Sequence, residues 1–232
     1  MLADVKPPPD RLYGRGRGHT LRPRQVRLLQ QTLPRIAFRP EHAVDPRRGF
    51  AVPVSEVWLE VGFGSGEHAL AQIDARPDVG LIASEVFENG ICSLLSRLVP
   101  EGGEAEAGLP GNLRLWADDA RGLLRMLPGG SLDRLFLLFP DPWPKTRHAK
   151  RRFVHPAFLP VLARALKQGA EWRVATDDPI YQAWVTDVMA AQELLTTGLA
   201  ASVRPADWPP TRYEAKALAA GRRPAYWSFI RR

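Results

Sequence analysis

Short apolar runs alternate with longer amphipathic segments from residue 55 to the C-terminus. The apolar runs, rich in Val, Leu, Ile and Trp, predict strands over 56–62, 80–85, 112–117, 132–139, 171–176 and 225–232. The segments between them predict helices over 66–76, 89–99, 119–127, 155–167 and 179–192. Strands that alternate with helices favour a mainly parallel sheet covered on both faces. We therefore expect residues 36–232 to form a single α/β domain.

The N-terminal part of the chain has a different composition. Residues 1–35 are rich in Pro, Gly and Arg around "YGRGRGHTLRPRQ", and we expect a basic, flexible arm. Within it, "RQVRLLQQTL" (24–33) predicts a short amphipathic helix. The beginning lacks the apolar core of a signal peptide, no apolar run is long enough to span a membrane, and the one cysteine, Cys92, excludes an internal disulfide. We expect a cytoplasmic protein without a membrane segment or a bound metal.

Charge is unevenly distributed along the chain, whose net charge is +7. Residues 1–50 carry 11 basic and 4 acidic side chains, whereas residues 51–140 carry 6 basic and 13 acidic ones. Residues 141–155 are again basic, with 5 basic side chains and 1 acidic one. An acidic middle between basic segments suits an enzyme that holds a cationic or hydroxyl-rich cofactor centrally and a polyanion peripherally. A solvated, arginine-rich surface would give the same totals.

A glycine-rich loop follows the first predicted strand. "LEVGFGSGEHA" (59–69) places Gly62, Gly64 and Gly66 before a helix, where backbone N–H groups can approach a ligand closely. The pattern also fits the loose dinucleotide fingerprint, with Glu85 as the acid for ribose hydroxyls at the end of the second strand.

Two further acids favour a different cofactor. Glu60 lies two residues before the first glycine, where it would repel a pyrophosphate and attract the amino group and sulfonium of S-adenosyl-L-methionine. Asp119 follows the third strand, where an acid can approach the adenine. A glycine turn with Asp118 or Asp119 as a helix N-cap would need no ligand at all. The ordered set of glycines and acids nevertheless favours a methyl donor.

The segment "FPDPWPKTRHAKRR" (139–152) follows the fourth predicted strand, beside the expected ligand crevice. Asp141 is immobilised between Pro140 and Pro142, and Trp143 offers an aromatic face to an unstacked base. The Lys and Arg residues after it suit contacts with phosphates. A proline turn leading into a solvated basic helix is the simpler alternative.

This corner closely resembles a family signature. "FPDPWPKTRHAKRRFVHPAFL" is similar to the signature of bacterial-type tRNA (guanine-N7-)-methyltransferases, and "VATDDPIYQAWV" (174–185) and "PTRYEAKALAAGRRPAYWSF" (210–229) extend the resemblance. It covers the chain from about residue 13 to the C-terminus, with Pro144 as a departure. The resemblance implies a Rossmann-like, seven-stranded, mainly parallel sheet with an antiparallel C-terminal strand. It also implies methyl transfer from S-adenosyl-L-methionine to N7 of a variable-loop guanosine, at position 46 of the tRNA.

The resemblance also implies roles for individual residues. It assigns the cofactor site to Glu60, Gly62, Gly64, Gly66, Glu85, Asp119 and Asp141, with Asp141 as the catalytic residue. It assigns substrate binding to Lys145, Asp177, Thr211, Arg212, Tyr213 and Glu214. It assigns RNA contacts to Arg147, His148, Lys150, Arg151 and Arg152.

Some of these positions have structural alternatives. Thr211 and Glu214 also fit a capping box for a helix. Asp178 before Pro179 also fits a helix N-cap, so the substrate-binding aspartate at this point of the chain is either Asp177 or Asp178. A nicotinamide-dependent reductase would explain the loose fingerprint, and a non-catalytic RNA-binding module would explain the basic segments. The presence of all four expected cofactor-site acids argues against a non-catalytic module. These acids are Glu60, Glu85, Asp119 and Asp141. We expect a monomer or a homodimer that binds tRNA.

Overall fold

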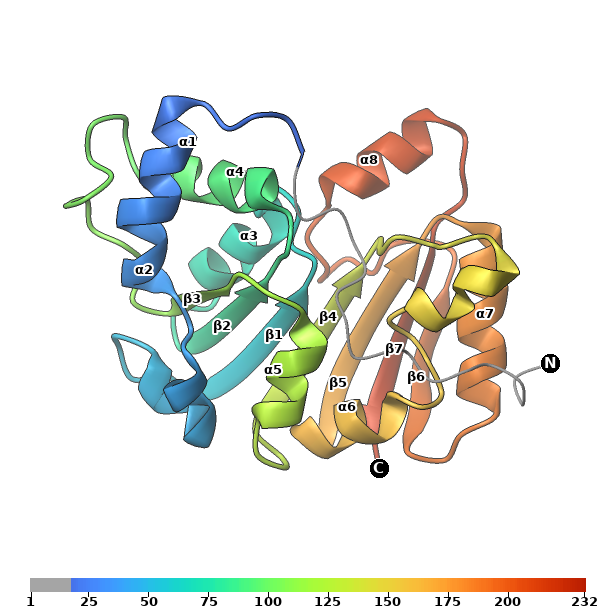
Figure 1. Cartoon of the computed structure of the whole chain (residues 1–232). Coiled ribbons are helices and arrows are strands. Elements are labelled where there is room, and N and C mark those ends of the chain that lie inside the picture. The colour runs from blue at the N-terminus through green and yellow to red at the C-terminus, as the bar shows by residue number, and fades with distance from the viewer. Residues whose placement is uncertain (1–17) are drawn as a thin grey trace.

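The computed structural model describes residues 18–232, which build one seven-stranded sheet in the order β3-β2-β1-β4-β5-β7-β6 (Figure 1). The strands are β1 (Glu56–Val61), β2 (Val79–Ser84), β3 (Leu113–Trp116), β4 (Leu132–Leu138), β5 (Leu166–Thr176), β6 (Leu195–Ala201) and β7 (Ala225–Arg231). Strands β1 to β5 pair in parallel, whereas β7 runs antiparallel to both β5 and β6. The predicted mainly parallel sheet with an antiparallel C-terminal strand is confirmed.

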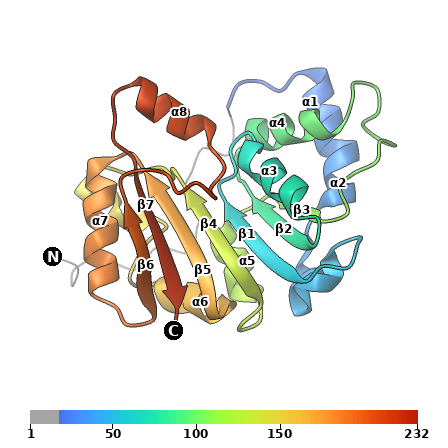
Figure 2. The ribbon, with the colours of Figure 1, turned by 180° about the vertical axis from the view of Figure 1, so that it is seen from behind.

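Helices cover both faces of this sheet (Figures 1 and 2). They are α3 (Glu67–Ala75), α4 (Glu88–Leu98), α5 (Ala120–Met126), α6 (Leu159–Ala165), α7 (Pro179–Ala190) and α8 (Arg212–Ala219). Alternation along β1 separates two cores: Val57 and Leu59 pack with α5, α6 and α7, whereas Trp58 packs with α3 and α4.

The N-terminal helix belongs to the folded domain rather than to an arm. Helix α1 (Pro23–Arg27) continues through a π-helical turn over 28–32 into α2 (Leu33–Ile36). Leu28 is completely buried, and the Thr32 hydroxyl donates to the carbonyl of Glu104 at 2.7 Å. The short helix predicted over 24–33 is therefore present. The expected boundary at residue 35 is wrong for residues 23–35, because their apolar face packs on the domain, and residues 1–17 lie outside the described part.

Two strands differ from the sequence pattern. Strand β6 is not predicted individually, because "LTTGLAA" alternates poorly and Gly198 lies at a register shift against β7. Strand β5 begins at Leu166, five residues before the predicted start, and its pairing with β4 is irregular there. Both segments take their strand conformation from pairing with neighbours rather than from local preference. Within the described residues, no helix is both long and apolar enough to cross a membrane.

Candidate active site

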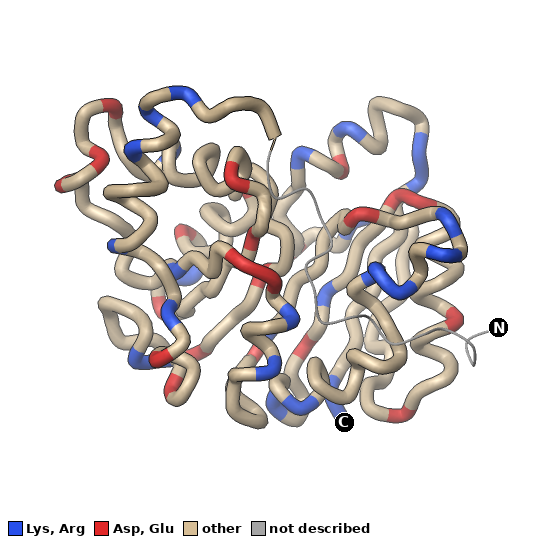
Figure 3. Tube along the Cα trace, in the orientation of Figure 1, with Lys and Arg blue, Asp and Glu red and all other residues tan. Residues whose placement is uncertain are grey.

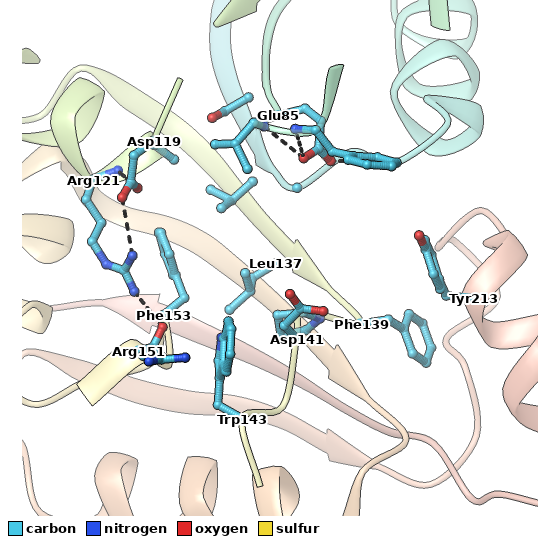
Figure 4. Close-up of a pocket in the computed structure, with 18 residues that line it drawn as sticks. Glu85, Asp119, Arg121, Leu137, Phe139, Asp141, Trp143, Arg151, Phe153 and Tyr213 are labelled. Carbon is cyan, nitrogen blue, oxygen red and sulfur yellow. Dashed lines mark hydrogen bonds and ion pairs between the residues drawn. The ribbon is translucent and has the colours of Figure 1, made fainter. Parts of the chain in front are cut away.

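A cavity of about 560 Å³ opens where the carboxyl ends of β1, β2 and β4 meet. Its wall includes Gly62 and Gly64 after β1, Glu85 after β2, Asp119 before α5 and Asp141 after β4. Figure 4 shows Asp119 at one end of the cavity, Tyr213 of α8 at the other, and Glu85 across from Asp141. This is the edge of a parallel sheet at which ligands bind in open α/β folds, at the point where the strand order reverses.

The glycine loop has the backbone conformation for which glycine is required. Gly62, Gly64 and Gly66 have φ values of 74°, 60° and 82°. A Cβ on Gly64 would lie 3.1 Å from Cε2 of Tyr213, so a side chain there would also crowd α8. Gly66 does not line the cavity; it precedes α3 as its N-cap, with Leu94 of α4 against it. Two of the three predicted glycines therefore face the cavity.

Glu85 fixes the loop from the neighbouring strand. Its Oε2 accepts from the N–H of Gly64 at 2.9 Å, and its Oε1 accepts from the N–H groups of Val86 and Phe87 at 2.8 and 3.0 Å. Burial raises the pKa of Glu85 above its usual range, and the three N–H donors act in the opposite direction. A carboxylate offers about four acceptor sites, so one remains for a ligand hydroxyl.

Glu60 does not line the cavity, contrary to the expectation that it faces the ligand crevice. It is 3% exposed, and its Oε2 lies 3.0 Å from Nδ1 of His68 on α3. Nε2 of His68 lies in turn 3.1 Å from Nε2 of Gln72. The alternation along β1 that sends Trp58 toward α3 sends Glu60 to the same face. The carboxylate therefore lies on the α3 side of β1, within a buried polar chain that the sequence pattern does not reveal.

Asp119 both caps a helix and forms an ion pair. Its Oδ1 accepts from the N–H of Arg121 at 2.9 Å as the N-cap of α5, and its Oδ2 lies 3.4 Å from Nη1 of Arg121. The capping alternative is thus correct for Asp119. The same residue lines the cavity, so capping and ligand contact are compatible.

The corner that carries Asp141 is held in an uncommon backbone conformation. Phe139 and Trp143 both have positive φ, 52° and 45°, although neither is glycine. Such conformations cost roughly 1–3 kcal/mol each and persist only where the surroundings enforce them, most often at functional sites. Between these two residues Asp141 is exposed and lines the cavity. The predicted acidic corner is present, and its backbone is more constrained than the prolines alone would require.

The basic segment after the corner forms a 3₁₀ turn over Thr146–Arg151. Figure 3 shows Lys and Arg gathered on this loop. Lys145 and Arg147 are exposed, whereas the guanidinium of Arg151 stacks on Trp143 at 4.8 Å and His148 packs against the edge of the same ring. Desolvation and the neighbouring cations lower the pKa of His148.

Arg152 does not share this exposed arrangement. It is 4% exposed, and it donates to the carbonyls of Pro142 and Trp143 at 3.2 and 3.1 Å. The predicted RNA contact is therefore not supported for Arg152, because its guanidinium is already used inside the protein.

The predicted substrate residues of the segment 211–214 are also partly exposed and partly used inside the protein. Thr211 caps α8 by accepting from the N–H of Glu214 at 3.1 Å, and Glu214 is buried with its Oε1 2.7 Å from the Tyr226 hydroxyl. Tyr213 lines the cavity and is 49% exposed, and Arg212 donates to Ser65 at 3.3 Å. The capping box is confirmed, which leaves Arg212 and Tyr213 as the members of this segment that face outward.

The two aspartates after β5 also have distinct environments. Asp178 caps α7 by accepting from the N–H of Tyr181 at 2.8 Å. Asp177 instead pairs with the exposed Arg222, and its side chain is 21% exposed. Of the two candidates, Asp178 is therefore used as a helix cap, whereas Asp177 pairs with a side chain at the surface.

Several residues of the cavity wall carry no recognisable sequence signal. They are mainly aromatic or hydrophobic residues at the ends of the strands and in the loops that follow, together with one buried arginine: Phe87, Leu137, Phe139, Phe153 and Arg121. Phe87 lies two residues after Glu85 and could have been found from that spacing. The others meet only in the folded chain. Among the described residues, no group of three or more His, Cys, Asp or Glu side chains could hold a metal ion.

Solved structures similar to this chain share its fold at low sequence identity. The 16S rRNA methyltransferase KamB superposes with a TM-score of 0.57 at 16% identity, covering 77% of this chain and 89% of that one. A 16S rRNA (adenine(1408)-N(1))-methyltransferase variant from Catenulisporales acidiphilia, determined with its cosubstrate SAM, gives 0.51 at 14% identity, covering 84% and 91%.

Sequence comparisons are more specific. A family model described as "Putative methyltransferase" matches residues 55–226. The tRNA (guanine-N(7)-)-methyltransferase of Granulibacter bethesdensis is 62% identical over 98% of both chains. The protein of the same name from Paramagnetospirillum magneticum is 48% identical over 96% of this chain and 93% of its own. This identity extends over nearly the full length of each protein, and the chain therefore belongs to the tRNA (guanine-N(7)-)-methyltransferase family.

Proposed function

We propose that this protein transfers a methyl group from S-adenosyl-L-methionine to N7 of a guanosine in the variable loop of tRNA, at position 46. The observation that carries this proposal is the placement of Asp141: a carboxylate on a constrained corner, between a glycine-loop cavity and an exposed basic segment. The cavity would take the methyl donor, and the basic segment would take the RNA backbone. The reaction would take place in the cytoplasm, with the protein as a monomer or a homodimer.

The residues of the cavity fit the proposed donor. Its volume, about 560 Å³, is within the usual range of small-molecule sites. Gly62 and Gly64 would allow close approach to the amino-acid part, Glu85 has an acceptor site for a ribose hydroxyl, and Asp119 would lie near the adenine. Carboxylates around the site also suit a cation. Bound there, S-adenosyl-L-methionine supplies an electrophilic methyl group on a sulfonium.

The proposed reaction requires no proton transfer by the protein. Guanine N7 carries an in-plane lone pair and no proton, so it can attack the methyl carbon without a general base. The N7–carbon bond forms as the carbon–sulfur bond breaks, which leaves S-adenosylhomocysteine and a cationic 7-methylguanine. Catalysis then depends mainly on holding N7 in line with the methyl group. Asp141 would orient the purine and stabilise the positive charge that develops on its imidazole ring.

Side chains at the cavity wall and in the basic segment suit the RNA. Trp143, at the wall, offers a ring for stacking by an unstacked base, while the exposed Lys145 and Arg147 and the half-buried Lys150 suit phosphates. Asp177, Arg212 and Tyr213 would contact the target nucleotide, whereas Thr211 and Glu214 would act through the helix that they cap.

The experiment that tests the proposal is incubation of the purified protein with methyl-labelled S-adenosyl-L-methionine and unmodified tRNA. The tRNA is then digested and its nucleosides are separated. We expect the label in 7-methylguanosine. Label in another nucleoside would support S-adenosyl-L-methionine as the donor but refute guanine N7 as the acceptor. The matched control is a tRNA transcript in which the variable-loop guanosine is replaced by adenosine. Loss of labelling with that transcript would locate the target.

A further inference from the structure

Two buried arginines lie beside the cavity without an assigned role. Arg121 is 6% exposed and Arg152 is 4% exposed. Burial of a guanidinium is costly unless its N–H groups are hydrogen-bonded, so each must be held by specific contacts. Those contacts connect the cofactor side of the cavity with the corner that carries Asp141.

Arg152 holds the corner through its backbone. Its Nε donates to the carbonyl of Pro142 at 3.2 Å and its Nη2 to the carbonyl of Trp143 at 3.1 Å. The guanidinium also stacks on Trp184 at 4.7 Å, and the Trp184 indole donates to the carbonyl of Val154. Within residues 18–232, Trp143 is one of two non-glycine residues with positive φ. The planar fork of Arg152 therefore bonds the very peptide groups that the uncommon conformation orients.

Arg121 fixes the segment from which Arg152 extends. Its Nη2 donates to the carbonyls of Arg151 and Arg152 at 3.0 and 3.2 Å, while its Nη1 lies 3.4 Å from Oδ2 of Asp119 (Figure 4). Its guanidinium also stacks on Phe153 at 5.4 Å. One continuous set of contacts thus runs from Asp119, through Arg121 and Arg152, to the backbone on the C-terminal side of Asp141.

We propose that Arg152 and Arg121 are positioning residues for methyl transfer: Arg152 sets the backbone that aims Asp141, and Arg121 ties that backbone to the Asp119 side of the cavity. This proposal rests on the proposed function. A guanidinium suits the task because its donors diverge from one rigid plane and can reach two carbonyls at once, which an ammonium cannot do with the same geometry. The position of Arg152 inside a basic run conceals this role, because the sequence does not distinguish it from the exposed cations of that run, Lys145 and Arg147.

The test compares Arg152→Lys with two other arginine variants. We expect Arg152→Lys to lower kcat by about 10-fold or more, because small displacements of a reacting group are costly, while the tRNA Kd and its salt dependence stay close to wild type. Arg147→Gln, at an exposed position, should instead reduce the slope of log Kd against log salt. Arg164→Lys is the matched control, because Arg164 also donates to backbone carbonyls, those of Leu124, Arg125 and Leu127, none of which lines the cavity. Its kcat should equal that of wild type.

The outcomes separate the two proposals. Wild-type protein that forms no 7-methylguanosine in the same assay would refute the proposed function. With an active wild type, a folded Arg152→Lys variant of unchanged kcat, or one whose defect lies wholly in tRNA affinity with a reduced salt slope, would overturn the positioning role. If thermal unfolding shows that Arg152→Lys does not fold, Arg121→Lys decides by the same readouts. There we expect a lower kcat with a raised KM for S-adenosyl-L-methionine, since Asp119 loses its partner, and unchanged values of both would overturn the proposal.

Discussion

The four acids predicted for the cofactor site have four different environments. Glu60 is buried against His68, Glu85 holds the glycine loop, Asp119 caps α5, and Asp141 is exposed in the cavity. A carboxylate that already accepts several N–H groups contributes mainly by keeping its neighbours in place. The Asp141 carboxylate is thus the best placed of the four to meet the purine directly.

Replacement of Asp141 by Asn should therefore act on the chemical step. We expect Asp141→Asn to lower turnover by roughly 100-fold, because the amide removes the charge that stabilises the cationic product-like transition state. The tRNA Kd should change little, since the basic segment is intact. Single-turnover methylation and filter binding measure the two quantities separately, and near-normal turnover would show that Asp141 has no electrostatic role.

Thr211 and Tyr213 are close in sequence but should respond differently to mutation. Thr211→Ala removes an N-cap and should lower the free energy of unfolding by about 1 kcal/mol. Tyr213→Leu should leave the free energy of unfolding almost unchanged, because the ring is half exposed. It should raise the KM of either S-adenosyl-L-methionine or tRNA several-fold, because the ring lines the cavity. Thermal unfolding and steady-state kinetics on both variants test this division. A Thr211→Ala variant of normal stability with a raised KM would instead support direct substrate binding by Thr211.

Among the elements, the N-terminal helix α1 forms ion pairs with one buried acid. Glu104, in the loop after α4, lies 3.6 Å from Arg24 Nε and 3.2 Å from Arg27 Nη2, and the Arg24 side chain also donates to the carbonyl of Val99. Cys92 of α4 lies under the same helix, with its Sγ 3.6 Å from the carbonyl of Gln25. Its reactivity therefore reports on how firmly α1 is docked.

We expect Cys92 to react slowly with a thiol reagent at pH 8 in the native protein. Burial raises the pKa of Cys92 to about 11, which lowers the thiolate fraction by about 100-fold, and the closed packing slows access further. Glu104→Gln should accelerate labelling several-fold by releasing α1. Glu106→Gln, at an exposed position in the same loop, is the control and should label like wild type. Equal rates in both variants would mean that the ion pairs do not hold the helix.

The sequence is informative for elements with a strong local pattern and less so elsewhere. Strand β1 and helix α3 can be placed within about one residue, because alternation, the glycine turn and the helix start agree with one another. Strand β6 cannot, because its conformation comes from pairing with β7. Glu60 is predicted correctly at the end of β1 but on the wrong side of it. Arg152 is indistinguishable from the other cations of its basic segment, because the pattern of charge along the chain contains no information on which guanidinium turns inward.

The distribution of charge over the fold agrees with the division along the sequence. Glu85, Asp119 and Asp141 line the cavity, whereas Lys and Arg gather on the loop after β4, of which Arg151 also lines the cavity (Figure 3). A cofactor with a positive centre and a polyanion can thus approach the same edge of the sheet from different sides. Because neutralised phosphates release counterions, the affinity for tRNA should fall steeply with salt.

The same salt dependence measures how many phosphates the basic loop neutralises. We expect the combined change Arg147→Gln and Lys150→Gln to reduce the slope of log Kd against log salt by roughly 0.7 to 0.9 for each phosphate that is no longer neutralised. Lys167→Gln is the control, because Lys167 pairs with Asp133 near the starts of β5 and β4, at the end of these strands away from the cavity. Its slope should match that of wild type. A control that lowers the slope as much as the double variant would indicate diffuse attraction by net charge, whereas an unchanged slope in the double variant would place the RNA backbone on another surface.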